Sequence, residues 1–256
     1  MSTYYNIKNR LVNELLVYAE AKLAAEIVLG LRYCAVKLDS GETGLAFSAL
    51  DNEFLQSDFV GGKNPLSGKP VVELLWKLES HNQLERAVGL AAANALANIK
   101  ERILLEGDVL KYLNVLPTDK VAMIGHFQPL EPRLKPLCAE LKIFEIDDDR
   151  LPGVLHYNEI DEFLPQSNII LITGAAFVND TIDDILPLCT NSRETVILGA
   201  STPLVPEAFA RTPVTLLSGV KIIASHFVLR SAAEGGGYQR FKPGIKKVNL
   251  KVERIP

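Results

Sequence analysis

The sequence has little of what marks membrane, secreted or nucleic-acid-binding proteins. No stretch approaches the roughly 18 consecutive apolar residues that a membrane span needs, and residues 1–8 contain no apolar signal segment. The net charge is only -4, and the 27 basic and 31 acidic side chains are interspersed, so no basic surface for a phosphate backbone is expected. We therefore expect a cytoplasmic protein that has neither a membrane nor a nucleic acid as its partner.

Cysteine and histidine are also scarce. Three cysteines, Cys34, Cys138 and Cys189, are scattered along the chain, which fits reduced thiols better than a disulfide framework. The four histidines form no H-x-x-x-H or H-E-x-x-H pair, and no C-x-x-C is present. The local spacing of a preformed zinc site is therefore absent, and only a metal site assembled from distant residues stays open.

Two glycine-containing motifs of known chemistry are missing as well. Where a dinucleotide-binding protein would carry G-x-G-x-x-G, residues 125–132 read Gly-His-Phe-Gln-Pro-Leu-Glu-Pro, with one glycine and two prolines that lack an N–H. This disfavours a pyrophosphate cradle for NAD or FAD. Because G-x-S-x-G is absent, Ser201 is not expected to be a hydrolase nucleophile.

The first hundred residues predict a small α+β domain. Apolar residues at four-residue spacing predict an amphipathic helix over residues 6–28. Two β-rich runs, residues 33–38 and 45–50, flank a turn-rich connection that suits a hairpin. A further helix is expected from Pro70 through Leu78, because proline is favoured at the first helical position.

A long loop and an alanine-rich helix complete this half. Residues 51–69, which include Asn64, form a connection of the length seen in lids and binding loops, although a plain surface loop is equally compatible. The helix expected over Leu84–Ile99 is so rich in alanine that neighbouring elements can approach its backbone closely. Asn94 in this apolar helix needs hydrogen-bond partners, and we expect it to tie down a nearby loop.

Beyond residue 104 the pattern changes to strands that alternate with helical segments, which is typical of a mostly parallel sheet. A helix-like segment from about Ser225 is interrupted at residues 235–237, three glycines, and residues 246–252 alternate as an edge strand would. We predict an α/β protein with domains over residues 1–104 and 105–256. The strands expected in the larger sheet are Val121–Gly125, Lys142–Ile146, Ile169–Gly174, Thr195–Ala200 and Val214–Ile223, with a short one at Val154–Tyr157.

Several of these strands end in small and polar residues, and in a parallel sheet such ends meet at one edge, where ligands bind. His126 follows one strand directly and is the best candidate acid or base, the alternative being a histidine hydrogen-bonded to the loop backbone. Asp180 or Thr181 is expected to cap the following helix, whose N-terminus favours a phosphate or carboxylate; plain capping without a ligand is the alternative. The predicted ligand-binding residues are Gly125, His126, Phe127, Glu145, Thr173, Gly174, Asn179, Thr181, Gly199, Ser201 and Thr202, with Asn64 arriving from the first domain.

The order of these motifs, from residues 125–129 through Glu145 and residues 173–181 to residues 199–206, resembles the prokaryotic family of putative heavy-metal chelation domains. The resemblance implies an N-terminal domain similar to the small domain of enolases, a Rossmann-like second domain and a cleft between them. Two residues depart from the family pattern, because Asp180 stands where a glycine is expected and Ala175 where threonine is frequent.

The leading hypothesis is therefore a chelation protein that binds a small anionic molecule or a metal complex between its domains, with a heavy-metal ion or its complex as the cofactor. A transferase or lyase that holds a nucleotide-like cofactor against Glu145, with His126 as acid or base, is the second hypothesis. The third is a non-catalytic scaffold, a homo-oligomer formed through the alanine-rich helix.

Overall fold

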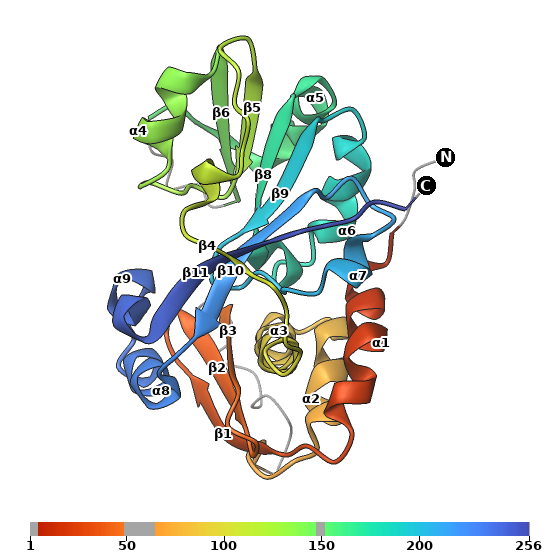
Figure 1. The fold of residues 1–256 in the computed structure, drawn as a ribbon, viewed down its shortest axis with the longest axis vertical. Helices are drawn as coiled ribbons and strands as arrows, with labels where there is room; N and C mark the ends of the chain where they lie inside the picture. Colours follow the sequence, from red (N-terminus) through yellow and green to blue (C-terminus); the bar gives the residue numbers. More distant parts are fainter. Residues whose placement is uncertain (1–4, 49–64, 147–151, 256) are drawn as a thin grey trace.

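The structure, a computed structural model, describes residues 5–48, 65–146 and 152–255. Within these ranges the strands form two sheets, one of three strands in the order β1-β2-β3 and one of eight in the order β4-β11-β10-β9-β8-β5-β6-β7. Figure 1 shows the small sheet at one end of the molecule and the larger sheet reaching the other. The predicted fold class, a small sheet followed by a larger and mostly parallel one, is confirmed.

The small sheet is a pair of antiparallel hairpins with a different core on each face. On its central strand Cys34 and Val36 point into one apolar cluster, whereas Ala35 points into another, as the two-residue period of a strand requires. Both faces of the sheet are therefore covered. Its strands are β1 (Ala24–Leu29), β2 (Tyr33–Leu38) and β3 (Thr43–Phe47).

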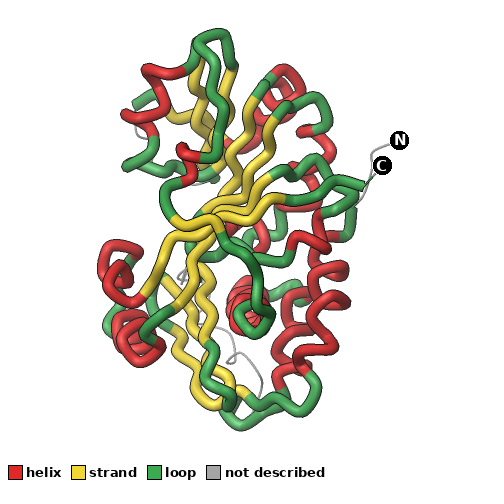
Figure 2. The backbone as a smooth tube through the Cα atoms, in the orientation of Figure 1, coloured by secondary structure: helices red, strands yellow, loops and turns green. Residues whose placement is uncertain are grey.

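The helices that cover the two faces come from opposite ends of the chain. Helices α1 (Ile7–Ala19), α2 (Val71–Trp76) and α3 (Gln83–Ala97) lie on one side, and α8 (Ser225–Ala233) lies on the other (Figures 1 and 2). A Cβ added to Gly44 of β3 would lie 2.1 Å from the Ala91 carbonyl oxygen of α3. The close approach expected of the alanine-rich helix is thus confirmed, and its small residues pack against this sheet.

The larger sheet winds outward from its middle. Strand β5 pairs in parallel with β6 on one side and with β8 on the other, and β9 and β10 continue the parallel set. The chain therefore reverses its direction of winding between β5 and β8, the point at which open α/β sheets bind ligands. The parallel strands are β5 (Lys120–Ile124), β6 (Glu140–Glu145), β7 (Val154–His156), β8 (Ile169–Thr173), β9 (Glu194–Leu198) and β10 (Leu216–Ile222).

Both faces of the larger sheet are apolar. Val121 and Met123 of β5 point to one cluster, and Ala122 and Ile124 point to the cluster that also contains the buried residues of α1 and α3. One continuous core thus runs from the large sheet into the helices on the small sheet. The connecting helices are short: α4 (Glu131–Leu134), α5 (Ile160–Phe163), α6 (Ile182–Ile185), α7 (Pro206–Phe209) and α9 (Tyr238–Phe241).

Two predicted elements are wrong in part. The helix expected over residues 6–28 ends at Ala19, because Ala21 turns the chain at a positive φ of 56° and residues 24–29 pair with β2 instead. Strand β11 (Ile245–Lys251) is not an edge strand, since β4 (Leu105–Glu106) pairs along its outer side. Among the described residues, no helix is both long and apolar enough to cross a bilayer.

Candidate functional site

The carboxyl ends of β5, β6, β8 and β9 surround a hollow of about 850 Å³, here called the central hollow. Tyr33 and Phe47 of the small sheet and Gln83 and Arg86 of α3 form its opposite wall. It therefore lies between the two sheets. The predicted residues that line it are Gly125, His126, Phe127, Glu145, Thr173, Gly174, Asn179, Thr181, Gly199 and Ser201.

One predicted residue of the described ranges does not line the central hollow, and another cannot be placed. Thr202 is buried and instead lines a neighbouring cavity of about 10 Å³, with its hydroxyl unpartnered among the described residues. Asn64 lies outside the described residues.

Glycine is required at two of the strand ends. Gly125 has a φ of 89°, and a Cβ at this position would lie 2.7 Å from the Cβ of Thr173. A Cβ on Gly174 would lie 2.7 Å from the backbone nitrogen of Thr202. Neighbouring strand ends therefore approach so closely that a side chain would force them apart.

His126 and Glu145 hold the loop after β5. The backbone N–H of His126 donates to Oε1 of Glu145 over 2.5 Å, and the Nε2 atom of the His126 ring lies 2.6 Å from Oε2 of Glu131. The ring partner is thus a carboxylate and not the loop backbone that the alternative expected. One Glu145 oxygen thus holds the loop, and no hydrogen bond from a described residue to the other oxygen is present.

The polar residues after β8 mostly bond to protein. Thr173 Oγ1 accepts from the N–H of Ala175, and Asn179 Oδ1 accepts from Nε2 of Gln83 over 2.9 Å, which joins this loop to α3. Thr181 occupies the N-cap position of α6, but no side chain caps that helix. The expected cap by Asp180 or Thr181 is therefore wrong.

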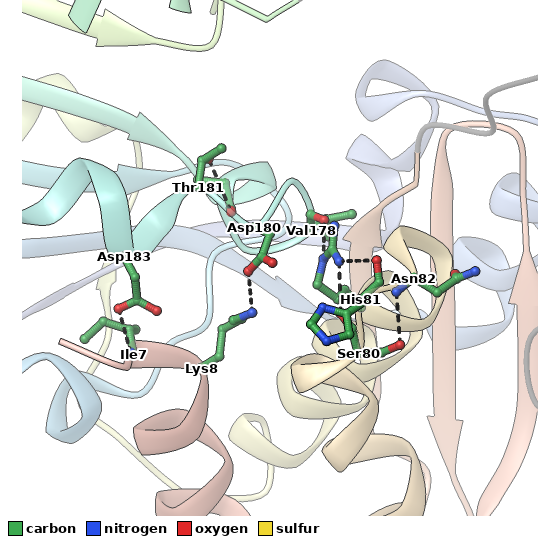
Figure 3. A network of polar contacts seen from close by, with 11 residues as sticks. Ile7, Lys8, Ser80, His81, Asn82, Val178, Asp180, Thr181 and Asp183 are labelled. Carbon is green, nitrogen blue, oxygen red and sulfur yellow. Dashed lines mark hydrogen bonds and ion pairs between the residues drawn. The ribbon is translucent and has the colours of Figure 1, made fainter. Parts of the chain in front are cut away.

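Asp180 instead forms an ion pair with Lys8 of α1, and its neighbour Asp183 accepts the N–H of Ile7 over 2.9 Å (Figure 3). Asp180 has a φ of 65°, in the left-handed region that favours glycine and that aspartate tolerates better than most residues. The residue that departs from the family pattern thus keeps a glycine-like backbone. Burial raises the pKa of Asp183, and the Ile7 N–H and Lys8 oppose this shift.

Ser201 connects the two sheets rather than acting as a free hydroxyl. Its Oγ accepts the N–H of Phe47, at the end of β3, over 2.7 Å, and the residue is 4% exposed. Asn94 of α3 donates to the carbonyls of Leu45 and Ser201 over 2.7 and 3.2 Å. The expectation that Asn94 ties down a nearby loop is confirmed.

Sequence reasoning missed the cation in the wall of the central hollow. Arg86 is 7% exposed, and its guanidinium donates to three backbone carbonyls, those of Val178 (2.7 Å), Ser80 (2.9 Å) and His81 (2.8 Å). No carboxylate forms an ion pair with it among the described residues. Burial lowers the pKa of Arg86, and Asp180 acts in the opposite direction. The sequence did contain a signal for this buried cation, because Arg86 lies within the apolar, alanine-rich pattern of residues 84–99.

Two phenols belong to the same wall. Burial raises the pKa of Tyr157 to about 12. The pKa of Tyr33 is also raised to about 12, mainly by burial and to a smaller extent by the neighbouring Tyr238. Both residues line the central hollow and are phenols at neutral pH, but the hydroxyl oxygen of Tyr157 is itself fully buried.

Two family models match the chain, one over residues 12–97 and one over residues 108–251, and both are described as "Putative heavy-metal chelation". The chain belongs to this family. It is similar to an uncharacterized protein of Methanocaldococcus jannaschii, with 26% identity over 96% of this chain and 97% of the other.

Two solved structures of proteins of unknown function from the same family share the fold. The protein from Pyrococcus horikoshii is 24% identical, with a TM-score of 0.84 over 96% of this chain and 100% of that one. The protein from Desulfitobacterium hafniense is 25% identical, with a TM-score of 0.83 over 97% and 98%.

The family description raises the question of whether this chain can ligate a metal ion directly. In residues 5–48, 65–146 and 152–255, no three His, Cys, Asp or Glu side chains come together as a metal site. Among the described residues that line the central hollow, only His126 and Glu145 are of these types; the His126 ring lies against Glu131, and Glu145 accepts the His126 N–H. The described donors therefore do not fit an ion held by protein ligands alone.

Proposed function

We propose that the protein binds a small anionic molecule, or the anionic chelate of a heavy-metal ion, in the central hollow between the two sheets. Arg86 is the observation that carries this proposal. Its charge is removed from water without a carboxylate ion pair among the described residues, and a buried charge of this kind is costly unless it is paired. A bound anion would supply the missing partner.

The geometry of Arg86 favours a ligand over a purely structural role. The three carbonyls engage Nε and Nη1, and no hydrogen bond from Nη2 to a described residue is present. Arginine presents its donors in a planar fork that suits carboxylates and phosphates. The O–H group of Tyr33, which also lines the hollow, would supply a further donor to an anionic occupant.

A chelate fits these groups better than a bare ion. A metal ion needs lone pairs that the described donors do not gather, whereas an organic chelator brings its own ligands and an outer surface of carboxylate oxygens. Such a surface would meet Arg86 and Tyr33. Heavy-metal chelation, the family description, would then be binding of the metal in complexed form.

Calorimetric titration of the chelator-stripped protein tests the proposal. The probes are citrate, the nickel–EDTA dianion and nickel chloride. We expect citrate or nickel–EDTA to bind and nickel chloride alone to give no specific heat. Arg86→Gln is expected to weaken binding by about 10- to 100-fold, because hydrogen bonds to charged groups contribute about 1.5–3 kcal/mol.

Arg211→Gln is the matched control, because Arg211 is exposed and does not line the central hollow. Circular dichroism of both variants shows whether each is folded, and Arg86→Lys keeps the charge if Arg86→Gln is unstable. Tight binding of nickel chloride alone, or binding of citrate and nickel–EDTA that Arg86 substitutions leave unchanged, contradicts the proposal.

A further inference from the structure

A second hollow of about 830 Å³ adjoins the central one. The two share Tyr33, Phe47 and residues 126–128, but the second extends toward α9, β10 and β11. We call it the basic hollow, because four cationic side chains and one carboxylate line it. These charged residues are Arg32, Arg133, Arg240, Lys247 and Asp108.

Asp108 is already shared by two of the four cations. Its carboxylate accepts from both terminal nitrogens of Arg133 over 2.8 and 3.1 Å, and the Lys247 ammonium lies 3.6 Å away. The hydrogen bond from Arg133 holds the pKa of Asp108 below its ordinary value, so this group is an anion at neutral pH. One negative charge therefore faces four positive charges in the wall.

The other two cations lie against the run of three glycines that interrupts the chain between α8 and α9. A Cβ on Gly236 would lie 2.9 Å from Cδ of Arg240, and one on Gly237 would lie 3.7 Å from Nη1 of Arg32. A side chain at position 236 would crowd Arg240, whereas one at position 237 would make only an ordinary contact with Arg32. The glycine run, singled out in the sequence only as a break in a helix, thus leaves room for Arg240 and lies against Arg32.

Neither arginine is neutralised within the hollow. Arg240 faces Glu234 at 3.6 Å, but both side chains are more than half exposed and Glu234 does not line the hollow. Among the described residues, Arg32 has no ion pair and its side chain makes no hydrogen bond. Exposed pairs of this kind contribute little, so the net positive charge remains available to a ligand.

We propose that the basic hollow binds a phosphate group, either free or carried by a small molecule. The wall has four positive charges and one negative charge, and this excess of positive charge matches a dianion. Arginine and lysine are the usual ligands of phosphate oxygens. The Lys247 ammonium, 5.8 Å from the centre of the Tyr238 ring, lies on the same wall. This inference is separate from the anion proposed for the central hollow.

Titration of the full chain with sodium pyrophosphate and inorganic phosphate at low ionic strength tests it. Arg32→Gln is expected to weaken pyrophosphate binding about ten-fold. Asp108→Asn is expected to strengthen it about five-fold, because it frees Arg133 and Lys247 while an amide oxygen can still accept the Leu110 N–H. Opposite effects of two substitutions in one hollow cannot come from loss of folding.

The control variants separate this inference from its alternatives. We expect Arg211→Gln to leave pyrophosphate binding within two-fold, and Arg32→Gln to weaken it more than Arg86→Gln does. If binding falls in Arg86→Gln but not in Arg32→Gln, the phosphate occupies the central hollow, which overturns the present inference and supports the proposed function. Equal losses in Arg32→Gln and Arg211→Gln show general attraction of ions and also overturn it. So does the absence of binding at millimolar pyrophosphate.

Discussion

Of the contacts that join the small sheet and its helices to the large sheet, two sets differ in burial. The buried set contains Asn94, Ser201 and the backbone of Leu45 and Phe47, and its hydrogen bonds involve no charge. The rim set contains the ion pairs Lys8–Asp180, Lys100–Glu207 and Arg102–Glu207. In the rim set Asp180 is 43% exposed and Glu207 is 36% exposed, so water competes for both carboxylates.

This difference indicates which contacts fix the geometry of the central hollow. When a buried neutral polar group loses its partner, the protein loses free energy of folding equal to the lost hydration of that group. An exposed ion pair only replaces contacts with water, so it adds little net stability. The buried set should therefore dominate the free energy that holds the two sheets together. The rim set should make a smaller contribution to this free energy, and that contribution should depend on pH.

Asn94→Leu is the strongest way to break the buried set. The amide of Asn94 serves two carbonyls, so its removal is expected to lower the free energy of unfolding by about 2–4 kcal/mol. Urea unfolding followed by circular dichroism measures this change. The control is Asn13→Leu on the exposed face of α1, for which we expect less than about 0.5 kcal/mol. Equal effects of the two substitutions contradict the comparison.

Ser201→Ala removes one bond of the same set. The hydroxyl accepts a single N–H, so the expected loss is about 1–2 kcal/mol, smaller than for Asn94. The same urea experiment applies, with Ser225→Ala as the control because the Ser225 hydroxyl makes only an exposed 3.3 Å contact with the Gly41 carbonyl. If the Ser201→Ala variant keeps its stability but loses ligand binding, the result contradicts this structural role and supports the ligand-binding role predicted from the sequence.

The sequence contained enough to predict the larger sheet and the convergence of its strand ends. Runs such as residues 121–125 and 169–174 are continuous apolar segments followed by glycine, and that local pattern reports a buried parallel strand directly. The same pattern could not tell a ligand contact from a contact between parts of the chain. Ser201 and Asn179 have the right chemistry at the right edge, yet each bonds to protein from the first half.

Other features could not be predicted from local sequence patterns, because they depend on residues that are distant along the chain. The periodicity of residues 6–28 suits a helix, but the pairing of residues 24–29 with β2 decides otherwise. Ala35 is buried by Val228 and Leu229 of α8, nearly two hundred residues further along the chain. Arg86 was missed for the same reason, since the carbonyls of residues 80, 81 and 178 that hold it meet only in the folded chain. The predicted domain boundary at residue 104 stays a prediction.

The Lys8→Met substitution tests the rim set by removing its Lys8–Asp180 ion pair. We expect a loss of about 1 kcal/mol, because Asp180 keeps access to water when its partner is removed. Asp180→Gly is expected to change stability less, since glycine adopts the positive φ at this position without steric cost and offsets the lost ion pair. Urea unfolding of both variants measures the difference, and a larger loss in Asp180→Gly than in Lys8→Met would contradict it.

Glu207→Gln is expected to have a small effect with a distinct pH signature, because Glu207 is 36% exposed and solvent screens its ion pairs. Burial alone would raise the pKa of Glu207, but hydrogen bonds from Arg102 and Lys100 outweigh it and lower the pKa from 4.5 to about 2. Between these values the unfolded chain binds more protons than the folded chain, so the stabilisation is present above pH 4.5 and is lost as the pH falls toward 2. Urea midpoints at pH 6 and pH 3 should therefore lie closer together in Glu207→Gln than in the wild type. If the difference between the two midpoints is unchanged, the ion pairs of Glu207 do not contribute to stability, and Lys8–Asp180 is the only pair of the rim set left to do so.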